Sequence, residues 1–495
     1  MKQNLATLNK DYTKVVSIKH LIVLGCFFIM TGIGWAHCPV MNWMQVYGGS
    51  ADEAFHAVEY IDGYGYIGAG YTVSSGFGGK DAYLVMTDLN GNIRWEKTYG
   101  GSQDDVANAI IIAANCYIFV GYTQSMGYGG KDIYIVCVDK EGVMLWKQNY
   151  GSSADEEALA IVQDQDGGYL ITGYTGSYDR NIVLLKTDAC GNKLWYNNYL
   201  LVGDDVGYDV IDLADDGYMI AGSSDLLCGN QDDAIILKTD NSGAVSWIKR
   251  FGEKGIDVFR SVRQSSDNGY VLTGYTDSNN ENFDVYIVRL SENGDLLWAE
   301  TYGSTADEYG YAVQGQRANG YIICGYQENY DTDCYLINID DSGSMIWEKV
   351  LKLRGNNIGY ALKNTGSDKY LLAGSTDNYA SGNDNAFLIL LCSEIGENFA
   401  TTKSTEPVFS LSSNPAQVRT VINLELEKNS KVNIEIFNVM GQKVLDLGTR
   451  TFDKGVHKVV WNLQDKNGHH VASGVYLVKL VVDGQEFTER LVVMH

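Results

Sequence analysis

Proline is almost absent from this 495-residue chain: only Pro39, Pro407 and Pro415 occur, whereas glycine is abundant at 55 residues. Proline interrupts the hydrogen-bond ladder of a sheet, so its absence from 40–406 lets strands run uninterrupted there. Glycine is then the residue that makes the tight turns. Over this range the composition favours short strands joined by glycine turns.

Positive charge is also scarce, with 37 Lys and Arg against 62 Asp and Glu, a formal net charge of -25 and a pI near 4.6. A nucleic-acid binder must neutralise phosphates with clustered cations. We therefore expect no nucleic-acid partner. Cationic, metal-bridged or neutral partners fit better, and an acidic surface also keeps an exported protein soluble.

Histidine is rare as well, and His56 is the only one between residues 38 and 410. A histidine metal cluster is therefore excluded from that range, and no complete histidine-dependent catalytic dyad that repeats from blade to blade is visible. Carboxylate pairs remain open as catalysts, but a chain so rich in Asp and Glu forms such pairs by architecture alone.

A single long apolar run occurs, at 21–36, and four lysines precede it (Lys2, Lys10, Lys14 and Lys19). The run is short for a membrane span and ends in Gly34-Trp35-Ala36, where signal peptidase needs small residues. We predict a signal peptide over 1–36, with a retained membrane anchor as the alternative.

Tryptophan recurs about every 50 residues, and this period sets the fold. Each repeat contains four strand-like segments bounded by Gly and Asp turns, the signature of one propeller blade. We predict an all-β chain with a seven-bladed β-propeller over 37–393. The repeating tryptophans are Trp43, Trp95, Trp146, Trp195, Trp247, Trp298 and Trp347.

The first and last repeats are complementary, because the chain begins with a tryptophan strand and the seventh repeat lacks one. The first strand should therefore complete the last blade and close the ring, which removes the free edges. Superposition of this junction on an ordinary repeat brings Cys38 and Cys392 together across a hairpin position. We predict a Cys38–Cys392 disulfide, which an exported protein permits.

The periodicity stops after Cys392. Residues 394–410 are polar and turn-rich, as in a linker, and alternating strands resume from Leu411. About 85 residues with this pattern predict a small immunoglobulin-like β-sandwich over 411–495.

Acidic residues recur at one end of the blades, where the chain direction also gathers the longer loops. Carboxylates around this end could bind calcium, whose ligands are oxygens, or each could cap a turn or bond to the next blade. Calcium is therefore a possible cofactor. The metal candidates follow five of the seven tryptophans by nine residues: Asp52, Asp104, Asp155, Asp204 and Asp307.

Two further groups are ligand-binding candidates. Position +14 from each tryptophan is small in six repeats, as expected beside a crowded axis, but Asp209 breaks the pattern and should point toward the channel. Tyrosines of the Gly-Tyr-Thr-like segments could stack on sugars or peptide side chains, although such aromatics also pack between blades. These tyrosines are Tyr71, Tyr122, Tyr174, Tyr275 and Tyr326.

The repeats carry a recurrent motif: Trp95 is followed by Tyr99-Gly100-Gly101-Ser102, by Asp104, and then by Gly121-Tyr122-Thr123. The first repeat shows the same order. This pattern resembles the bacterial SBBP-type seven-bladed β-propeller repeats over 43–392. The resemblance implies the fold and leaves the activity open.

The last domain carries Asn414-Pro415, the segment 434–438 with Gly441-Gln442-Lys443-Val444, and 472–476 followed by strands. In this it looks like the type A C-terminal sorting domain of type IX secretion cargo. The resemblance implies type IX secretion machinery as a partner and delivery to the extracellular space or outer-membrane surface of a Gram-negative bacterium. An ordinary accessory sandwich is the alternative.

We expect a secreted or cell-surface binding module whose ligand is an extracellular protein or glycan, rather than an enzyme. A carbohydrate-active propeller enzyme using paired carboxylates and a structural surface-layer scaffold remain the alternatives. The first needs two carboxylates at hydrolytic separation beside aromatic platforms. The second predicts self-association without a small ligand.

Overall fold

The computed structural model describes residues 39–201, 203–213, 217–225, 232–252, 255–277, 282–316, 320–366, 369–377, 383–393, 408–412, 419–426, 428–438, 441–482 and 485–493. The chain divides between Glu394 and Ile395 into two compact units. The predicted signal peptide and the predicted linker up to residue 407 lie outside the described residues. Within the described ranges, no helix has the length and apolar character needed to cross a membrane.

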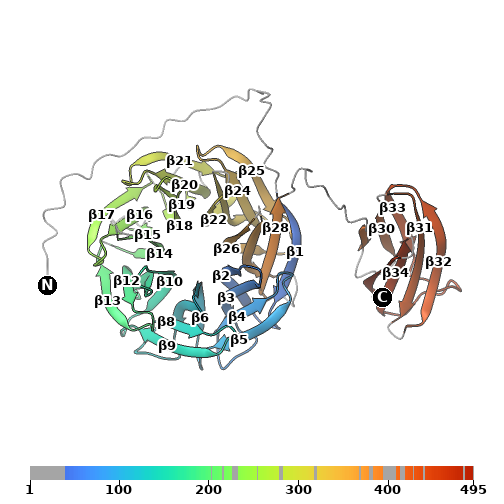
Figure 1. Cartoon of the computed structure of the whole chain (residues 1–495), viewed down its shortest axis with the longest axis horizontal. Coiled ribbons are helices and arrows are strands. Elements are labelled where there is room, and N and C mark those ends of the chain that lie inside the picture. The colour runs from blue at the N-terminus through green and yellow to red at the C-terminus, as the bar shows by residue number, and fades with distance from the viewer. Residues whose placement is uncertain are drawn as a thin grey trace, which may run out of the picture. The chain divides into compact units, whose positions relative to one another are not determined.

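In the described part of the first unit, the strands form seven four-stranded antiparallel sheets arranged around a common axis (Figure 1). The innermost strand of each sheet contacts the innermost strands of its two neighbours, and the last of them contacts the first. The innermost strands are β2 (Glu53–Ile61), β6 (Asp105–Ala113), β10 (Glu156–Gln163), β14 (Asp205–Asp212), β18 (Asp257–Gln264), β22 (Asp307–Gly315) and β26 (Asn357–Gly366).

The two middle strands of each sheet are almost completely buried, because neighbouring sheets cover both faces. Alternating and continuous apolar runs suit this position. The second strands are β3 (Gly65–Thr72), β7 (Cys116–Thr123), β11 (Tyr169–Thr175), β15 (Tyr218–Ser224), β19 (Tyr270–Thr276), β23 (Tyr321–Glu328) and β27 (Lys369–Thr376). The third strands are β4 (Asp81–Thr87), β8 (Asp132–Val138), β12 (Asn181–Thr187), β16 (Asp233–Thr239), β20 (Asp284–Leu290), β24 (Thr332–Ile339) and β28 (Asn385–Ser393).

The outermost strands carry the repeating tryptophans. Six of the seven rings, all but that of Trp347, pack against a turn glycine of the following blade; a Cβ on Gly142, for example, would lie 3.0 Å from the Trp95 ring. Gly142 has φ +76°, a left-handed conformation that glycine adopts without strain. The outer strands are β5 (Ile93–Tyr99), β9 (Met144–Tyr150), β13 (Lys193–Tyr199), β17 (Val245–Phe251), β21 (Leu296–Tyr302), β25 (Met345–Leu351) and β1 (Pro39–Tyr47).

The ring closes as the sequence predicts. β1 pairs with β28, from Pro39 opposite Ser393 to Tyr47 opposite Ala386, so the first strand completes the last sheet. The propeller prediction is confirmed in this respect. Cys392 is half-buried opposite Val40, whereas Cys38 lies outside the described residues. The Cys38–Cys392 disulfide therefore stays a prediction.

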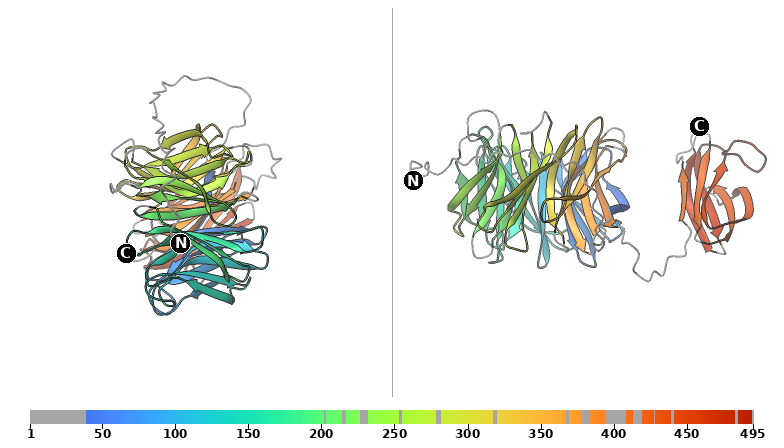
Figure 2. Two further views of the ribbon diagram at one scale, coloured as in Figure 1. Left: turned by 90° about the vertical axis from the view of Figure 1, so that its left-hand side faces the viewer. Right: turned by 90° about the horizontal axis from the view of Figure 1, so that it is seen from above.

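The strands cross the thickness of the ring, as the view from above in Figure 2 shows, so their ends form two faces. In the first sheet Glu53 at the start of β2 pairs with Thr72 at the end of β3, and Thr72 pairs with Asp81 at the start of β4. The loop 73–80 therefore lies at this end, together with its counterparts in the other blades. We call it the long-loop end. The opposite end carries short turns such as 62–64.

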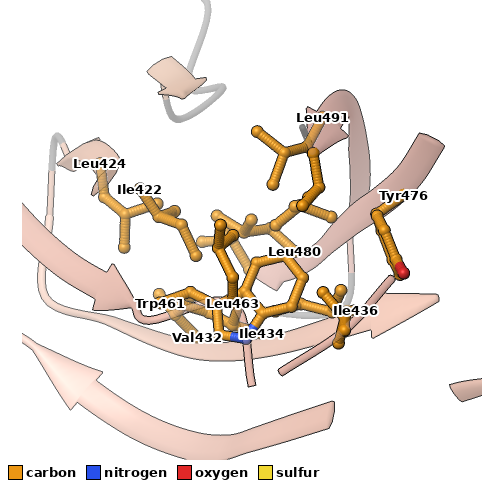
Figure 3. Packing of buried hydrophobic residues seen from close by; sticks show 14 of the residues in the cluster. Ile422, Leu424, Val432, Ile434, Ile436, Trp461, Leu463, Tyr476, Leu480 and Leu491 are labelled. Carbon is orange, nitrogen blue, oxygen red and sulfur yellow. The ribbon is translucent and has the colours of Figure 1, made fainter. Parts of the chain in front are cut away.

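The second unit consists of two antiparallel sheets around one apolar core. The buried Trp461 ring packs at its centre with Ile434 and Leu480 (Figure 3). This is the small β-sandwich expected at the C-terminus. Its sheets are β29 (Val408–Ser412), β30 (Thr420–Leu426) and β33 (Gly455–Trp461), and then β32 (Lys443–Phe452), β31 (Ser430–Asn438), β34 (Gly474–Val482) and β35 (Gln485–Val493).

Candidate ligand-binding site

Every innermost strand of the propeller contains one bulged residue near its start, at the long-loop end. In β2, for example, the pairing with β3 shifts between Phe55 and Ala57, which leaves His56 as the extra residue. A bulge turns its side chain away from the regular pleat and is common beside binding sites. The seven residues, which we call the axial bulge ring, are His56, Asn108, Leu159, Tyr208, Arg260, Tyr311 and Tyr360.

Side chains of the axial bulge ring contact one another from blade to blade. The Arg260 guanidinium lies 4.1 Å from the Tyr208 ring centre and 4.9 Å from that of Tyr311. The Tyr311 and Tyr360 rings lie 5.6 Å apart, and Tyr360 meets His56 edge-on at 5.4 Å. A continuous arc of aromatic and cationic groups thus follows the axis over five blades, and all of its members are half-buried.

The two members of the axial bulge ring outside this arc are Asn108, which is polar, and Leu159, which is apolar. The Nδ2 group of Asn108 donates to Glu157 Oε1 and to the Ala158 carbonyl, both at 2.9 Å. These bonds assign Oδ1 of Asn108 as the acceptor that faces His56 Nδ1 at 3.1 Å, so Nδ1 carries the proton. Burial, together with Lys80, lowers the pKa of His56. His56 is therefore a neutral hydrogen-bond donor at pH 7.

Arg260 remains charged although it is largely enclosed. Burial alone would lower its pKa, but the neighbouring hydroxyl groups of Tyr208, Tyr311 and Tyr275 raise the pKa by more than burial lowers it. Its Nε is buried and has no hydrogen-bond partner. The Tyr275 ring centre lies 5.8 Å from the guanidinium. A cation with aromatic walls and a free N–H is suited to binding an anionic or π-rich group.

The predicted ligand-binding tyrosines lie next to the axial bulge ring, and each one contacts a cation or another aromatic side chain. Lys80 Nζ lies 3.9 Å from the Tyr71 ring centre, and Lys131 Nζ lies 4.0 Å from that of Tyr122. Tyr71 also contacts His56, and Tyr326 contacts Tyr311, each at 5.6 Å between ring centres. The remaining two are Tyr174, which donates to Glu157, and Tyr275, which contacts Arg260.

The side chain of Asp209 points toward β18 of the next blade, and both of its carboxylate oxygens accept hydrogen bonds. Oδ2 accepts from Ser261 Oγ and Val262 N at 3.0 Å and from Arg263 Nη1 at 2.6 Å. Oδ1 accepts from the N–H of Val210. The observed role of Asp209 is to join β14 to β18, and its ligand role stays a prediction.

The five aspartates predicted as metal ligands all make the same contact. In each, Oδ1 accepts the backbone N–H of a residue of the preceding blade, at 2.8 to 3.1 Å. Within the described ranges, no group of three or more His, Cys, Asp or Glu residues is arranged to hold a metal ion. The donors to Asp52, Asp104, Asp155, Asp204 and Asp307 are Asp384, Lys80, Lys131, Arg180 and Phe283.

Carboxyl groups also meet in pairs where blades join. A Cβ on Gly100 would lie 2.3 Å from Asp81 Oδ1 and 2.7 Å from Asp105 Oδ2, so these oxygens are separated by at most the sum, about 5 Å. Burial and then the charge of Asp105 raise the pKa of Asp81. Asp105 Oδ2 accepts from Gly101 N and Ser125 Oγ, which fixes the loop. The pairs recur at equivalent positions and thus belong to the repeat.

The axial bulge ring was not among the residues singled out from the sequence, although a signal for it exists. The residue thirteen positions after each tryptophan varies, with five residue types in seven blades: His, Asn, Leu, Tyr, Arg, Tyr and Tyr. Position +14 beside it is small in most blades. A repeat position that varies in chemistry while its neighbours do not is typical of a binding site on a repetitive scaffold.

Comparison with known proteins identifies a family that the second unit resembles. Residues 413–494 match the family described as the secretion system C-terminal sorting domain. A search of curated proteins finds no match to the chain.

Several solved structures resemble the chain at 12% identity or less. PorZ, described as an essential bacterial surface component of the type-IX secretion system of Porphyromonas gingivalis, gives a TM-score of 0.43 at 12% identity, with 91% of this chain covered. The chain spans 60% of the length of PorZ. A protein of unknown function from Dyadobacter fermentans gives 0.42 at 11% identity, with 72% of this chain and 99% of that one covered. The sorting domain indicates that this chain is a secreted or cell-surface protein exported by a type IX system.

Proposed function

We propose that this protein is a binding module that captures an extracellular glycan or peptide at the long-loop end of its propeller axis. Its sorting domain delivers it through the type IX secretion machinery to the outside of the cell. The axial bulge ring carries this proposal. Its members differ from blade to blade and contact one another in a continuous arc, whereas the surrounding aspartates and tyrosines repeat.

Exposed aromatic side chains on the long loops support the same conclusion. Phe77, Tyr128, Tyr178 and Tyr330 are 83%, 79%, 92% and 100% exposed, and each lies between the second and third strands of its blade. All four therefore belong to the long-loop end. Aromatic groups left in water at one end of a molecule mark an interaction surface, and aromatic faces stack on sugars and on peptide side chains.

Binding of the full-length secreted chain to glycan and peptide arrays tests the proposal. Tyr360→Ala removes the ring that contacts His56 and Tyr311, and Tyr64→Ala is the matched control in a short turn at the opposite end. We expect wild type to bind at least one class, Tyr360→Ala to lose about tenfold in affinity, and Tyr64→Ala to match wild type. Equal binding by all three would refute this location.

The other two functions remain distinguishable by simple measurements. A carbohydrate-active enzyme would release products from an array glycan, and a surface-layer scaffold would self-associate in sedimentation without binding either array. Calcium, if it acts as a cofactor, would raise the thermal midpoint of the full chain relative to chelator.

A further inference from the structure

Arg260 is a half-buried arginine in an acidic chain with a net charge of -25. Four arginines of the propeller form ion pairs with aspartate. Arg260 has no carboxylate partner among the residues that the structure describes; Arg94 and Arg354 have none either, but both are exposed to solvent. A cation that is left unpaired among 62 carboxylates calls for an explanation. The pairs are Arg180–Asp204, Arg250–Asp233, Arg263–Asp209 and Arg289–Asp267.

Aromatic rings take the place of carboxylates around this guanidinium. Tyr208, Tyr311 and Tyr275 have their ring centres 4.1, 4.9 and 5.8 Å from it. Tyr309 extends this wall, since its ring lies 5.0 Å from Tyr275. Cation–π contacts and a hydrogen bond to Tyr275 hold the guanidinium in place, but they leave its Nε without a hydrogen-bond partner.

The ligand that completes this arrangement carries a carboxylate on a ring. A carboxylate accepts paired N–H bonds from a guanidinium, which is the strongest neutralising contact available to it, and a flat ring face stacks on tyrosine. The strong negative charge of the chain disfavours polyanions, since every additional charge on the ligand is repelled. A single carboxylate therefore fits best, borne either by a sugar acid or by an aromatic acid.

We propose that Arg260, with Tyr208, Tyr275 and Tyr311, binds the carboxylate of a ring-bearing monocarboxylic acid at the long-loop end of the axis. This inference rests on the proposed function, because it assigns ligand chemistry to the same site. It also assigns the selectivity to one group. The guanidinium favours a ligand with a negative charge, whereas the tyrosines stack equally on a sugar ring or an aromatic ring.

Two matched ligand pairs test the inference on the full-length chain by saturation-transfer NMR titration. Methyl β-glucuronide and methyl β-glucoside differ only in carboxylate against hydroxymethyl, and benzoate and benzamide differ in charge on one ring. We expect the acid of at least one pair to bind wild type tenfold or more tightly than its neutral partner. The pair that shows this preference tells a sugar acid from an aromatic acid.

Three variants test whether the acid preference depends on Arg260 itself rather than on any loss of positive charge or of stability. Arg260→Gln should abolish the acid preference, while Arg260→Lys should keep a weaker one, so a folding failure of the first leaves the second informative. Arg263→Gln is the control on the same strand, because that arginine is already paired with Asp209; it should behave as wild type. Thermal midpoints verify that the variants fold.

Three outcomes would overturn the inference. Equal binding of acid and neutral partners, or an acid preference that survives Arg260→Gln, would show that the guanidinium does not recognise a carboxylate. Absence of binding by all four compounds would also reject the inference. None of these outcomes contradicts the proposed function if array binding still depends on Tyr360, so failure of the inference and failure of the proposed function can be told apart.

Discussion

Asp104 accepts a hydrogen bond from the backbone N–H of Lys80 at 2.8 Å, so a carboxylate of one blade holds the main chain of the preceding blade. The contact is reciprocal, since the N–H of Asp105 donates to the Lys80 carbonyl at 2.6 Å. Two equivalent hydrogen bonds join the last blade to the first: the N–H of Asp384 donates to Asp52 Oδ1, and the N–H of Glu53 donates to the Asp384 carbonyl. These aspartates thus repeat because the same acceptor joins the blades at five junctions, and Asn356 Oδ1 accepts from the N–H of Thr332 at a sixth.

Asp104→Ala removes this acceptor and should lower the free energy of unfolding by about 1.5 to 3 kcal/mol, the usual contribution of a hydrogen bond to a charged group. Asp104→Asn keeps Oδ1 and should lose less than half as much. Urea unfolding of both variants measures the difference. A calcium-dependent rise in stability that Asp104→Asn abolishes would instead favour the predicted metal role.

Gly142→Ala tests the packing that produces the tryptophan period. The new Cβ would lie 3.0 Å from Trp95 at a positive φ, so we expect a loss of about 2 to 3 kcal/mol from overpacking and backbone strain. Gly167→Ala is the matched control, with φ +80° and no atom within 4 Å of the Cβ. It should cost only the strain, about 1 kcal/mol. Equal losses in thermal or urea unfolding would contradict the packing account.

Asp205 should make stability depend on pH in an unusual direction. Burial raises its pKa to about 7, helped by Asp204, Asp225 and Asp232, whereas the Ser224 hydroxyl lowers it. The folded state therefore binds the proton more tightly than the unfolded chain, whose aspartate pKa is about 4. The contribution is fully present below pH 4 and is lost as the pH rises through 7.

Asp205→Asn replaces the carboxyl group by an amide that does not ionise, so the variant should not lose this stability as the pH rises. We expect the variant to gain stability relative to wild type as the pH rises from 4.5 to 8, by at most about 4 kcal/mol. Denaturant unfolding at several pH values measures it, with the exposed Asp188→Asn as control. A wild-type minus variant difference that stays flat over this range would disprove the raised pKa.

Export should depend on the folded sorting domain. Deletion of 411–495 should retain the chain in the periplasm of a bacterium with type IX machinery. Trp461→Ala, which empties the centre of the sandwich core, should reduce the amount in the medium several-fold. The substitution Lys458→Ala, at an exposed residue outside the sorting motif, is the control. Immunoblots of the medium and periplasm report both, and undiminished export of the deletion would exclude the sorting role.

The sequence was sufficient to predict the repeat and the features of the fold that follow from it. The tryptophan period predicts the four-stranded sheets, and the missing last strand predicts the pairing of β1 with β28. Periodic features arise from contacts that recur around the propeller, such as that of Trp95 with Gly142, which has equivalents at five other tryptophans. Such contacts leave a signal that one chain carries several times over.

The candidate site was less accessible to sequence reasoning, because a bulge adds one residue without changing the pattern around it. Alternation alone places His56 in a regular strand, yet the pairing skips it and redirects its side chain. Asp209 stood out by chemistry, but its partner Arg263 comes from the next blade and could not be assigned from spacing. The site emerges only when neighbouring blades are brought together.

The measurement that most directly tests the central claim is hydrogen–deuterium exchange of the full chain with and without its tightest array ligand. Our account predicts slower exchange in the first residues of the innermost strands, around His56, Arg260 and Tyr360, and in loops such as 73–80. Protection confined to the outer strands or to the short turns at the opposite end would show that the ligand binds elsewhere.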